Sequence, residues 1–193
     1  MKTPSFLSSL VAILSLASCQ QQQESKIEPL KEQPVHAIED TSVKRGAYLV
    51  TLMDCNTCHT PNDMTERGPQ PDMSRRLSGY PDNRPVPEFD KAIAAKGVMF
   101  YHPDLTAAAG PWGISFAANI TPDDTGIGTW SLEQFERSMR EGKHKGLEGS
   151  RMLLPPMPWQ SYASLTDADL EAIFNYLKSI QPIENVVPGP IAP

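Results

Sequence analysis

The hydrophobic and polar positions divide the chain into segments of contrasting pattern. An apolar run from Phe6 to Leu16 follows Lys2, and a polar run extends from Gln20 to about Ser42. The apolar run is too short to span a bilayer and, with a basic residue before it and small residues after it, is typical of a secretory signal peptide. The polar run has almost no apolar periodicity, which predicts a flexible tether.

Three later segments have the periodicity of amphipathic helices. Residues 43–55 form the first, in which Gly46 costs about 1 kcal/mol relative to alanine. This glycine is either tolerated on the surface or explained by a second helix that crosses there with its backbone close. Ser131 opens the next predicted helix with a capping-box pattern. Thr166 caps the last and most regular helix, which Pro182 stops.

Regular periodicity fails between the first two helices, from Thr60 to about Ala118. Prolines interrupt this segment repeatedly, and only residues 88–96 have the pattern of a short helix. Its aromatic residues, among them Phe100 and Trp112, indicate packing onto the core rather than disorder. The pattern therefore predicts three main helices, a long proline-rich irregular insertion at about 60–118, and an extended tail at 183–193.

The motif with the most specific chemistry is Cys55-Asn56-Thr57-Cys58-His59. Two thiols three positions apart on a helical turn can add to the two vinyl groups of one porphyrin, and the adjacent imidazole then lies under the iron as proximal ligand. A zinc site would need a second ligand pair, and no cysteine follows Cys58. A thioredoxin-like redox pair would need a βαβ context, which is not predicted here. The motif indicates one covalently bound c-type haem.

Three residues are candidates for the distal ligand of the iron. Met157 lies between Pro156 and Pro158, which stiffen the backbone, so that the loop presents its sulfur at low entropic cost. Met152 is an alternative that lacks flanking prolines, and His102 in the insertion is another. A methionine in an apolar loop is more often core packing, but the upstream haem motif favours ligation by Met157.

The third cysteine suggests how the protein is held in its compartment. Leu16-Ala17-Ser18-Cys19 resembles a bacterial lipoprotein cleavage box, in which the cysteine becomes the lipid-modified first residue. Ordinary secretion is the alternative, but lipidation would leave no free thiol in an oxidising compartment. The resulting prediction is a leader at 1–18, a tether at 19–42 and one domain at 43–182, anchored to a membrane of the bacterial envelope on its periplasmic or outer surface.

The charge balance restricts the partners. The formal net charge of −6 argues against binding to nucleic acid and is compatible with docking to a basic patch on a redox protein. After removal of the leader, the remaining length accommodates one domain and its tails.

These features together resemble a class I c-type cytochrome domain from about Val43 to Ile180. The stretch from Asn119 to Pro182 is more specific, with Asn-Ile-Thr-Pro-Asp, Thr-Gly-Ile-Gly-Thr-Trp-Ser, Pro-Pro-Met-Pro-Trp and Leu-Thr-Asp-Ala-Asp-Leu. It is similar to the branch that includes cytochrome subunits of periplasmic alcohol and sugar dehydrogenases. The resemblance implies an all-α cytochrome c fold, with three main helices around one covalently bound haem c.

The resemblance also implies residue roles. The thioether cysteines would be Cys55 and Cys58, and the axial ligands His59 and Met157. Trp130 and Trp159 would line the haem. The terminal helices would cross at Gly46 and the region 174–177. Two features depart from the branch: its subunits typically carry several such domains where this chain has one motif, and the segment 60–118 is longer than in small soluble cytochromes.

Three functions are compatible with the sequence. The first is one-electron transfer between a redox donor and an acceptor, such as a dehydrogenase or terminal oxidase; His–Met ligation leaves no open iron site, so this interpretation is a carrier or electron-transfer subunit rather than an enzyme. The second is a haem enzyme or gas sensor with a displaceable Met157, in which His102 acts on a bound molecule. The third is a thiol–disulfide oxidoreductase that uses Cys55 and Cys58.

Overall fold

The computed structural model describes residues 35–193, with side chains described from Thr41 onward. The predicted leader, Cys19 and the tether as far as residue 34 lie outside the described residues. The helices are α1 (Val35–Leu52), α2 (Cys55–His59), α3 (Lys91–Ala94), α4 (Leu132–Glu141), α5 (Trp159–Tyr162) and α6 (Asp167–Ser179), with 3-10 turns η1 (Met73–Arg75) and η2 (His144–Gly146). The strands are β1 (Asn62–Thr65), β2 (Gly68–Pro71), β3 (Phe100–Tyr101), β4 (Ala107–Gly110) and β5 (Gly113–Phe116). In this part of the chain, no helix is both long enough and apolar enough to cross a membrane.

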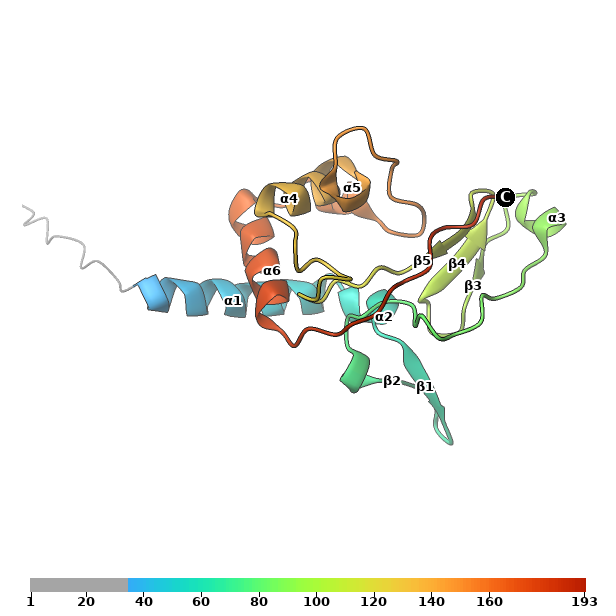
Figure 1. The fold of residues 1–193 in the computed structure, drawn as a ribbon, viewed down its shortest axis with the longest axis horizontal. Helices are drawn as coiled ribbons and strands as arrows, with labels where there is room; N and C mark the ends of the chain where they lie inside the picture. The colour runs from blue at the N-terminus through green and yellow to red at the C-terminus, as the bar shows by residue number, and fades with distance from the viewer. Residues whose placement is uncertain (1–34) are drawn as a thin grey trace, which may run out of the picture. The chain divides into compact units, whose positions relative to one another are not determined.

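Helices α1 and α6 cross each other at Gly46 (Figure 1). A Cβ atom at this position would overlap the carbonyl oxygen of Ala172 and lie 2.7 Å from the Cβ of Tyr176. The two backbones can approach this closely only because glycine has no side chain. The predicted crossing is therefore confirmed. Helix α1 begins at Val35 rather than Val43, so the last residues of the predicted tether are helical.

The core lies where α1, α4 and α6 meet. The most deeply buried apolar residues of this cluster are Leu49, Val50, Leu77, Ile127, Phe135, Met139, Leu170, Ile173 and Leu177. Helix α4 begins with the predicted capping box, in which the Ser131 hydroxyl accepts from the Gln134 N–H and the Gln134 side chain accepts from the Ser131 N–H. Thr166 caps α6 by accepting from the Asp169 N–H. Both predicted helix starts are confirmed.

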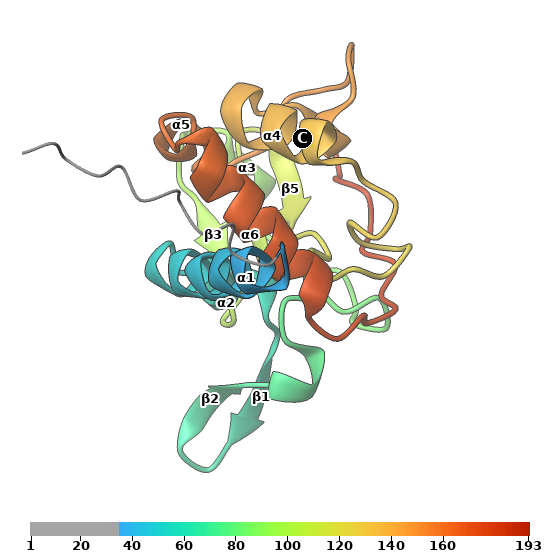
Figure 2. The same cartoon turned by 90° about the vertical axis from the view of Figure 1, so that its left-hand side faces the viewer.

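The insertion contains two antiparallel sheets, so the all-α fold class predicted from the sequence is wrong. Strands β1 and β2 form a hairpin that projects from the helices (Figure 2), and β3, β4 and β5 form a second sheet in that order. Each strand has only two to four residues, and all four residues of β4 are buried. Strands of this length are too short for an apolar–polar alternation to be recognised in the sequence, and β4 is in addition buried along its whole length.

The insertion is nevertheless packed, as its aromatic residues predicted. Tyr80 and Thr106 are fully buried in it. The short helix predicted at residues 88–96 corresponds to α3, whose N-terminus is capped by the Asp90 carboxylate. The insertion is therefore a folded part of the domain rather than a loose loop.

The C-terminal tail is extended and returns to the insertion (Figure 1). The backbone of Ile191 pairs with Ile114 of β5, with N···O distances of 2.8 and 3.0 Å. The buried Asn185 side chain donates to the carbonyls of Ser78 and Tyr80 and accepts from the Asp82 N–H. These contacts make the tail part of the folded domain.

Candidate functional site

Helix α2 is a single turn that carries both thiols of the Cys-x-x-Cys-His motif. It follows Asp54, which is in the left-handed conformation (φ 56°, ψ 38°) and accepts a 2.6 Å hydrogen bond from the Thr57 hydroxyl. Residues three apart on a helix are neighbours on its surface, so Cys55 and Cys58 lie on one side of the turn. Both are half-buried free cysteines. This is the arrangement that attachment of one porphyrin through two thioether bonds requires.

The surroundings of the thiols keep them protonated at neutral pH. Burial raises the pKa of Cys55 to about 11, and the charge of Asp54 adds to the shift. Burial, with a smaller effect of Asp54, also raises the pKa of Cys58. Redox-active cysteines are instead found where the thiol pKa is lowered, because the thiolate is the nucleophile. The raised pKa values of both thiols therefore disfavour the thiol–disulfide oxidoreductase interpretation.

The imidazole of His59 is held in one tautomer by the backbone. Its Nδ1 lies 2.7 Å from the carbonyl oxygen of Ala118, and because a carbonyl can only accept, Nδ1 carries the proton. Nε2 then keeps its lone pair for a metal. Burial lowers the pKa of His59, while the Ala118 carbonyl opposes the shift, so the ring is neutral at pH 7. A neutral imidazole whose other nitrogen donates to a carbonyl is the form in which histidine binds iron in proteins.

The Ala118 carbonyl is held close to α2 by the chain that packs against it. The Gly79 N–H donates to the His59 carbonyl at 2.7 Å. Gly79 itself has φ +80°, and a Cβ there would lie 2.5 Å from the carbonyl carbon of Ala118. Glycine is therefore required at position 79 both for the left-handed backbone conformation and for the close approach of the Ala118 backbone.

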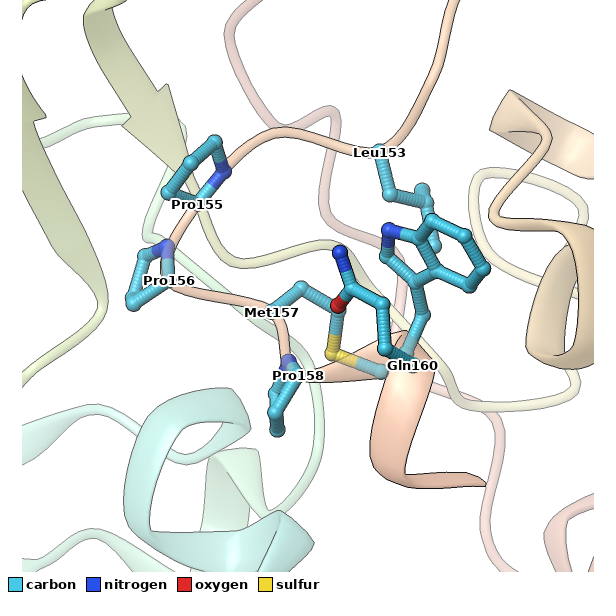
Figure 3. A pocket seen from close by; sticks show the side chains of 7 residues that line it. Leu153, Pro155, Pro156, Met157, Pro158 and Gln160 are labelled. Atoms are coloured by element: carbon cyan, nitrogen blue, oxygen red, sulfur yellow. The ribbon is translucent and has the colours of Figure 1, made fainter. Parts of the chain in front are cut away.

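Met157 lies on a turn framed by prolines (Figure 3). Its N–H donates to the Leu154 carbonyl at 3.3 Å, and the peptide bond between Pro155 and Pro156 is cis. The side chain is half-buried and packs against the same core cluster as Cys55. Leu153 and residues 155–160 line a hollow beside it. The loop therefore places a thioether at the edge of the core, on which the first motif cysteine also packs.

Helix α5 directly follows the loop of Met157 in the chain and contacts the backbone just before α2. Its last residue, Tyr162, donates from its hydroxyl to the Met53 carbonyl at 3.3 Å. Burial raises the pKa of Tyr162. The segment that follows Met157 thus lies beside α2. Tyr162 was not predicted from the sequence, although its spacing of three residues from Trp159 places both on one helix face.

The two predicted haem-lining tryptophans both lie near these elements. Trp130 packs against the core cluster that Cys55 and Met157 also contact. Trp159 lies against the end of α4, where a Cβ on Gly142 would overlap the Trp159 ring, and it lines the same hollow as Met157. Their roles as lining residues stay predictions.

His102, the alternative iron ligand that lies in the insertion, has hydrogen-bond partners in the same segment. Its Nδ1 lies 2.6 Å from the Asp104 carboxylate and 3.4 Å from the Arg84 guanidinium. Its ring meets that of Tyr80 edge-on. These partners all belong to the insertion, whereas Met157 and Cys55 pack against the same core cluster.

Comparison with known proteins supports the same chemistry. The family model for cytochrome c matches residues 43–181. The fructose dehydrogenase cytochrome subunit of Gluconobacter japonicus is 28% identical over 161 residues, which are 82% of this chain and 25% of that protein. The gluconate 2-dehydrogenase cytochrome c subunit of Pantoea cypripedii is 29% identical over 160 residues, 79% of this chain and 28% of that protein. A nicotinate dehydrogenase subunit of Pseudomonas putida is 42% identical over 80 residues, 41% of this chain and 6% of that protein. The chain thus spans less than a third of the length of each of these relatives.

Proposed function

Because the chain belongs to the cytochrome c family, whose members carry covalently bound haem c, we propose that it transfers single electrons through one haem at α2. Cys55 and Cys58 form the thioether bonds, His59 is the proximal ligand and Met157 the distal ligand. The haem supplies a one-electron iron couple. The chain supplies the ligands, the apolar surroundings and the access for partners.

The observation that carries this proposal is the state of His59. Its Nδ1 is occupied by the Ala118 carbonyl and its pKa is lowered by burial, so a neutral Nε2 is available on the same turn as the two thiols. A thiol redox pair would not need a histidine prepared in this way. A structural zinc site would, but it also needs further ligands, and the described residues bring together no group of three or more His, Cys, Asp or Glu side chains that could hold a metal ion. A thioether as the second ligand favours the ferrous state and raises the potential, which suits an electron carrier.

An alkaline pyridine haemochrome spectrum of the purified protein tests the cofactor. We expect one haem per chain with both vinyl groups saturated, one unsaturated vinyl group in the Cys55→Ser or Cys58→Ser variant, and no covalent haem when both cysteines are replaced. Carbon monoxide then separates the carrier from a haem enzyme or gas sensor. A carrier with Met157 firmly bound does not take up carbon monoxide when reduced, whereas ready binding would favour the second function.

We infer that the electron donor or acceptor is a catalytic subunit of a dehydrogenase, with a terminal oxidase as the other possible acceptor. The relatives from Gluconobacter japonicus and Pantoea cypripedii are named as cytochrome subunits of such enzymes. The net charge of −6 favours a basic docking patch on the partner. The rate of electron exchange with a basic partner should then fall as ionic strength rises.

The sequence further supports a lipid anchor at Cys19, which lies outside the described residues. Several acyl chains hold a protein at a membrane stably, because each buried methylene contributes about 0.8 kcal/mol. We expect Cys19→Ser to release the protein from the membrane fraction while its haem content stays normal. Recovery of the wild-type protein as a soluble species without lipid would contradict this.

A further inference from the structure

An ion pair with a buried carboxylate lies in the insertion, and hydrogen bonds connect it to the chain segments of both partners of the His59 hydrogen bond. The Arg84 guanidinium lies 2.6 Å from the Asp104 carboxylate, whose side chain is only 3% exposed. Arg84 also lies over the ring of buried Tyr80, with 5.3 Å between its Cζ and the ring centroid. Burying a charged pair carries a desolvation cost that only good geometry and further hydrogen bonds offset. Its position suggests what the pair does.

Asp104 contacts both of the chain segments that meet at His59. One oxygen accepts from the Asn62 N–H at 3.2 Å, three residues after His59. The other accepts from the N–H and the hydroxyl of Thr106, at 3.1 and 2.6 Å. The Thr106 carbonyl in turn accepts from the Ala117 N–H at 2.8 Å. One carboxylate thus ties the segment of the donor, His59, to the segment of the acceptor, Ala118.

The residues around Ala118 are fixed by the insertion as well. The Ala117 carbonyl accepts from the Tyr80 N–H at 3.0 Å, and the Ile120 N–H donates to the Leu77 carbonyl at 3.0 Å. Tyr80 is the residue whose ring Arg84 covers. The orientation of the Ala118 carbonyl is therefore set by the same network that holds the ion pair.

We propose that Arg84 and Asp104 are positioning residues that hold the Ala118 carbonyl against His59 Nδ1 and thereby set the reduction potential of the haem. The inference rests on the proposed function, since it requires His59 to ligate iron. A strong hydrogen bond from Nδ1–H gives the imidazole more anionic character and makes it a better donor to iron. A better donor favours the ferric state, so the intact network keeps the potential lower than a loosened one would.

A role in positioning the Ala118 carbonyl and a purely electrostatic role predict opposite changes in the reduction potential for one variant. By Coulomb's law, removing the negative Asp104 raises the potential and removing the positive Arg84 lowers it. If the pair acts by positioning, either change loosens the Ala118 carbonyl and both raise the potential. Arg84→Gln is therefore the decisive variant. Thr106→Val adds a change that leaves every charge in place but removes the hydroxyl that bonds Asp104.

The experiment uses the holoprotein and the variants Arg84→Gln, Asp104→Asn and Thr106→Val. The readouts are the reduction potential, by spectroelectrochemical titration, and the His59 Nδ1–H resonance of the reduced protein, by nuclear magnetic resonance. We expect all three variants to raise the potential and to move that resonance upfield with faster exchange, at unchanged haem content. Asp90→Asn is the matched control, because it removes an exposed charge from the same insertion and keeps a cap for α3. It should leave both readouts unchanged.

Two outcomes overturn the inference alone. One is a lower potential in Arg84→Gln with a higher one in Asp104→Asn and an unmoved Nδ1–H resonance, because the pair would then act by charge. The other, which decides the question if Arg84→Gln fails to fold, is a Thr106→Val variant with wild-type potential and resonance. A wild-type protein without covalent haem would instead overturn the proposed function, and this inference with it.

Discussion

Met157 is the residue on which the proposed ligation depends most. Replacing it by alanine should remove the sulfur-to-iron charge-transfer band of the oxidised protein, lower the reduction potential and let carbon monoxide bind the reduced haem. The physical reason is that a thioether ligand stabilises ferrous iron and closes the sixth position. Haem should stay covalently attached, since the Cys55 and Cys58 thioether bonds are untouched. Optical spectra and a redox titration of the purified variant measure all of these effects.

Met152 provides the matched control for this change. It is 40% exposed, so Met152→Ala should cost less than the roughly 2–5 kcal/mol of a buried methionine and leave the spectrum as it is. Loss of the sulfur band in Met152→Ala, with the band retained in Met157→Ala, would show that the other methionine is the ligand. A spectrum that responds only to His102→Ala would indicate bis-histidine ligation and a much lower potential.

The chemistry of single residues was predictable from the sequence only where side chains carry it. The spacing of Cys55, Cys58 and His59 is a side-chain pattern, and it led directly to the haem interpretation. The Ala118 carbonyl that orients His59 is a backbone atom from a segment 59 positions away, and an alanine gives no sign of it. The role of Asp104 could not be predicted either. Its carboxylate accepts from five donors, which only the fold brings together, on Asn62, Arg84, His102 and Thr106.

At the scale of elements, the crossing of α1 and α6 depends on one missing side chain. Gly46→Ala would place a methyl group against the Ala172 backbone, which cannot move without shifting α6. Overpacking of this kind costs about 1–3 kcal/mol, so the midpoint of urea denaturation should fall. Gly189→Ala, at a position with open space around it, should change stability by no more than about 0.5 kcal/mol. An unchanged midpoint in Gly46→Ala would mean that the helices can separate at little cost.

The elements that were predicted correctly are those whose signals are local. Helices α4 and α6 have a capping residue and an apolar face within their own sequence. The early start of α1 at Val35 was not predicted, because residues 35–42 lack an apolar stripe. Strands β3 to β5 were missed for a different reason: their stability comes from pairing with one another and from burial of small residues, which are properties of the fold.

At the scale of the whole described molecule, the insertion and the C-terminal tail depend on each other. The family match ends at residue 181, yet Ile191 pairs with β5 and Asn185 lies buried among backbone groups of the insertion. The insertion in turn carries the network that holds the Ala118 carbonyl. The tail therefore supports the environment of His59, although it lies beyond the segment that carries the resemblance.

Asn185 tests this dependence. Asn185→Ala removes two donors, to the Ser78 and Tyr80 carbonyls, and one acceptor, for the Asp82 N–H. Each buried backbone group left without a partner costs about 1–3 kcal/mol, so the free energy of unfolding should fall clearly. Because the lost bonds all end in the insertion, limited proteolysis should cut residues 60–118 faster than in the wild type, before the helices are attacked. Val186→Ala, at a neighbouring side chain that is 62% exposed, should leave the cleavage pattern unchanged. If Asn185→Ala lowered stability but the first cuts fell in α4 or α6, the tail would be supporting the helical core and not the insertion.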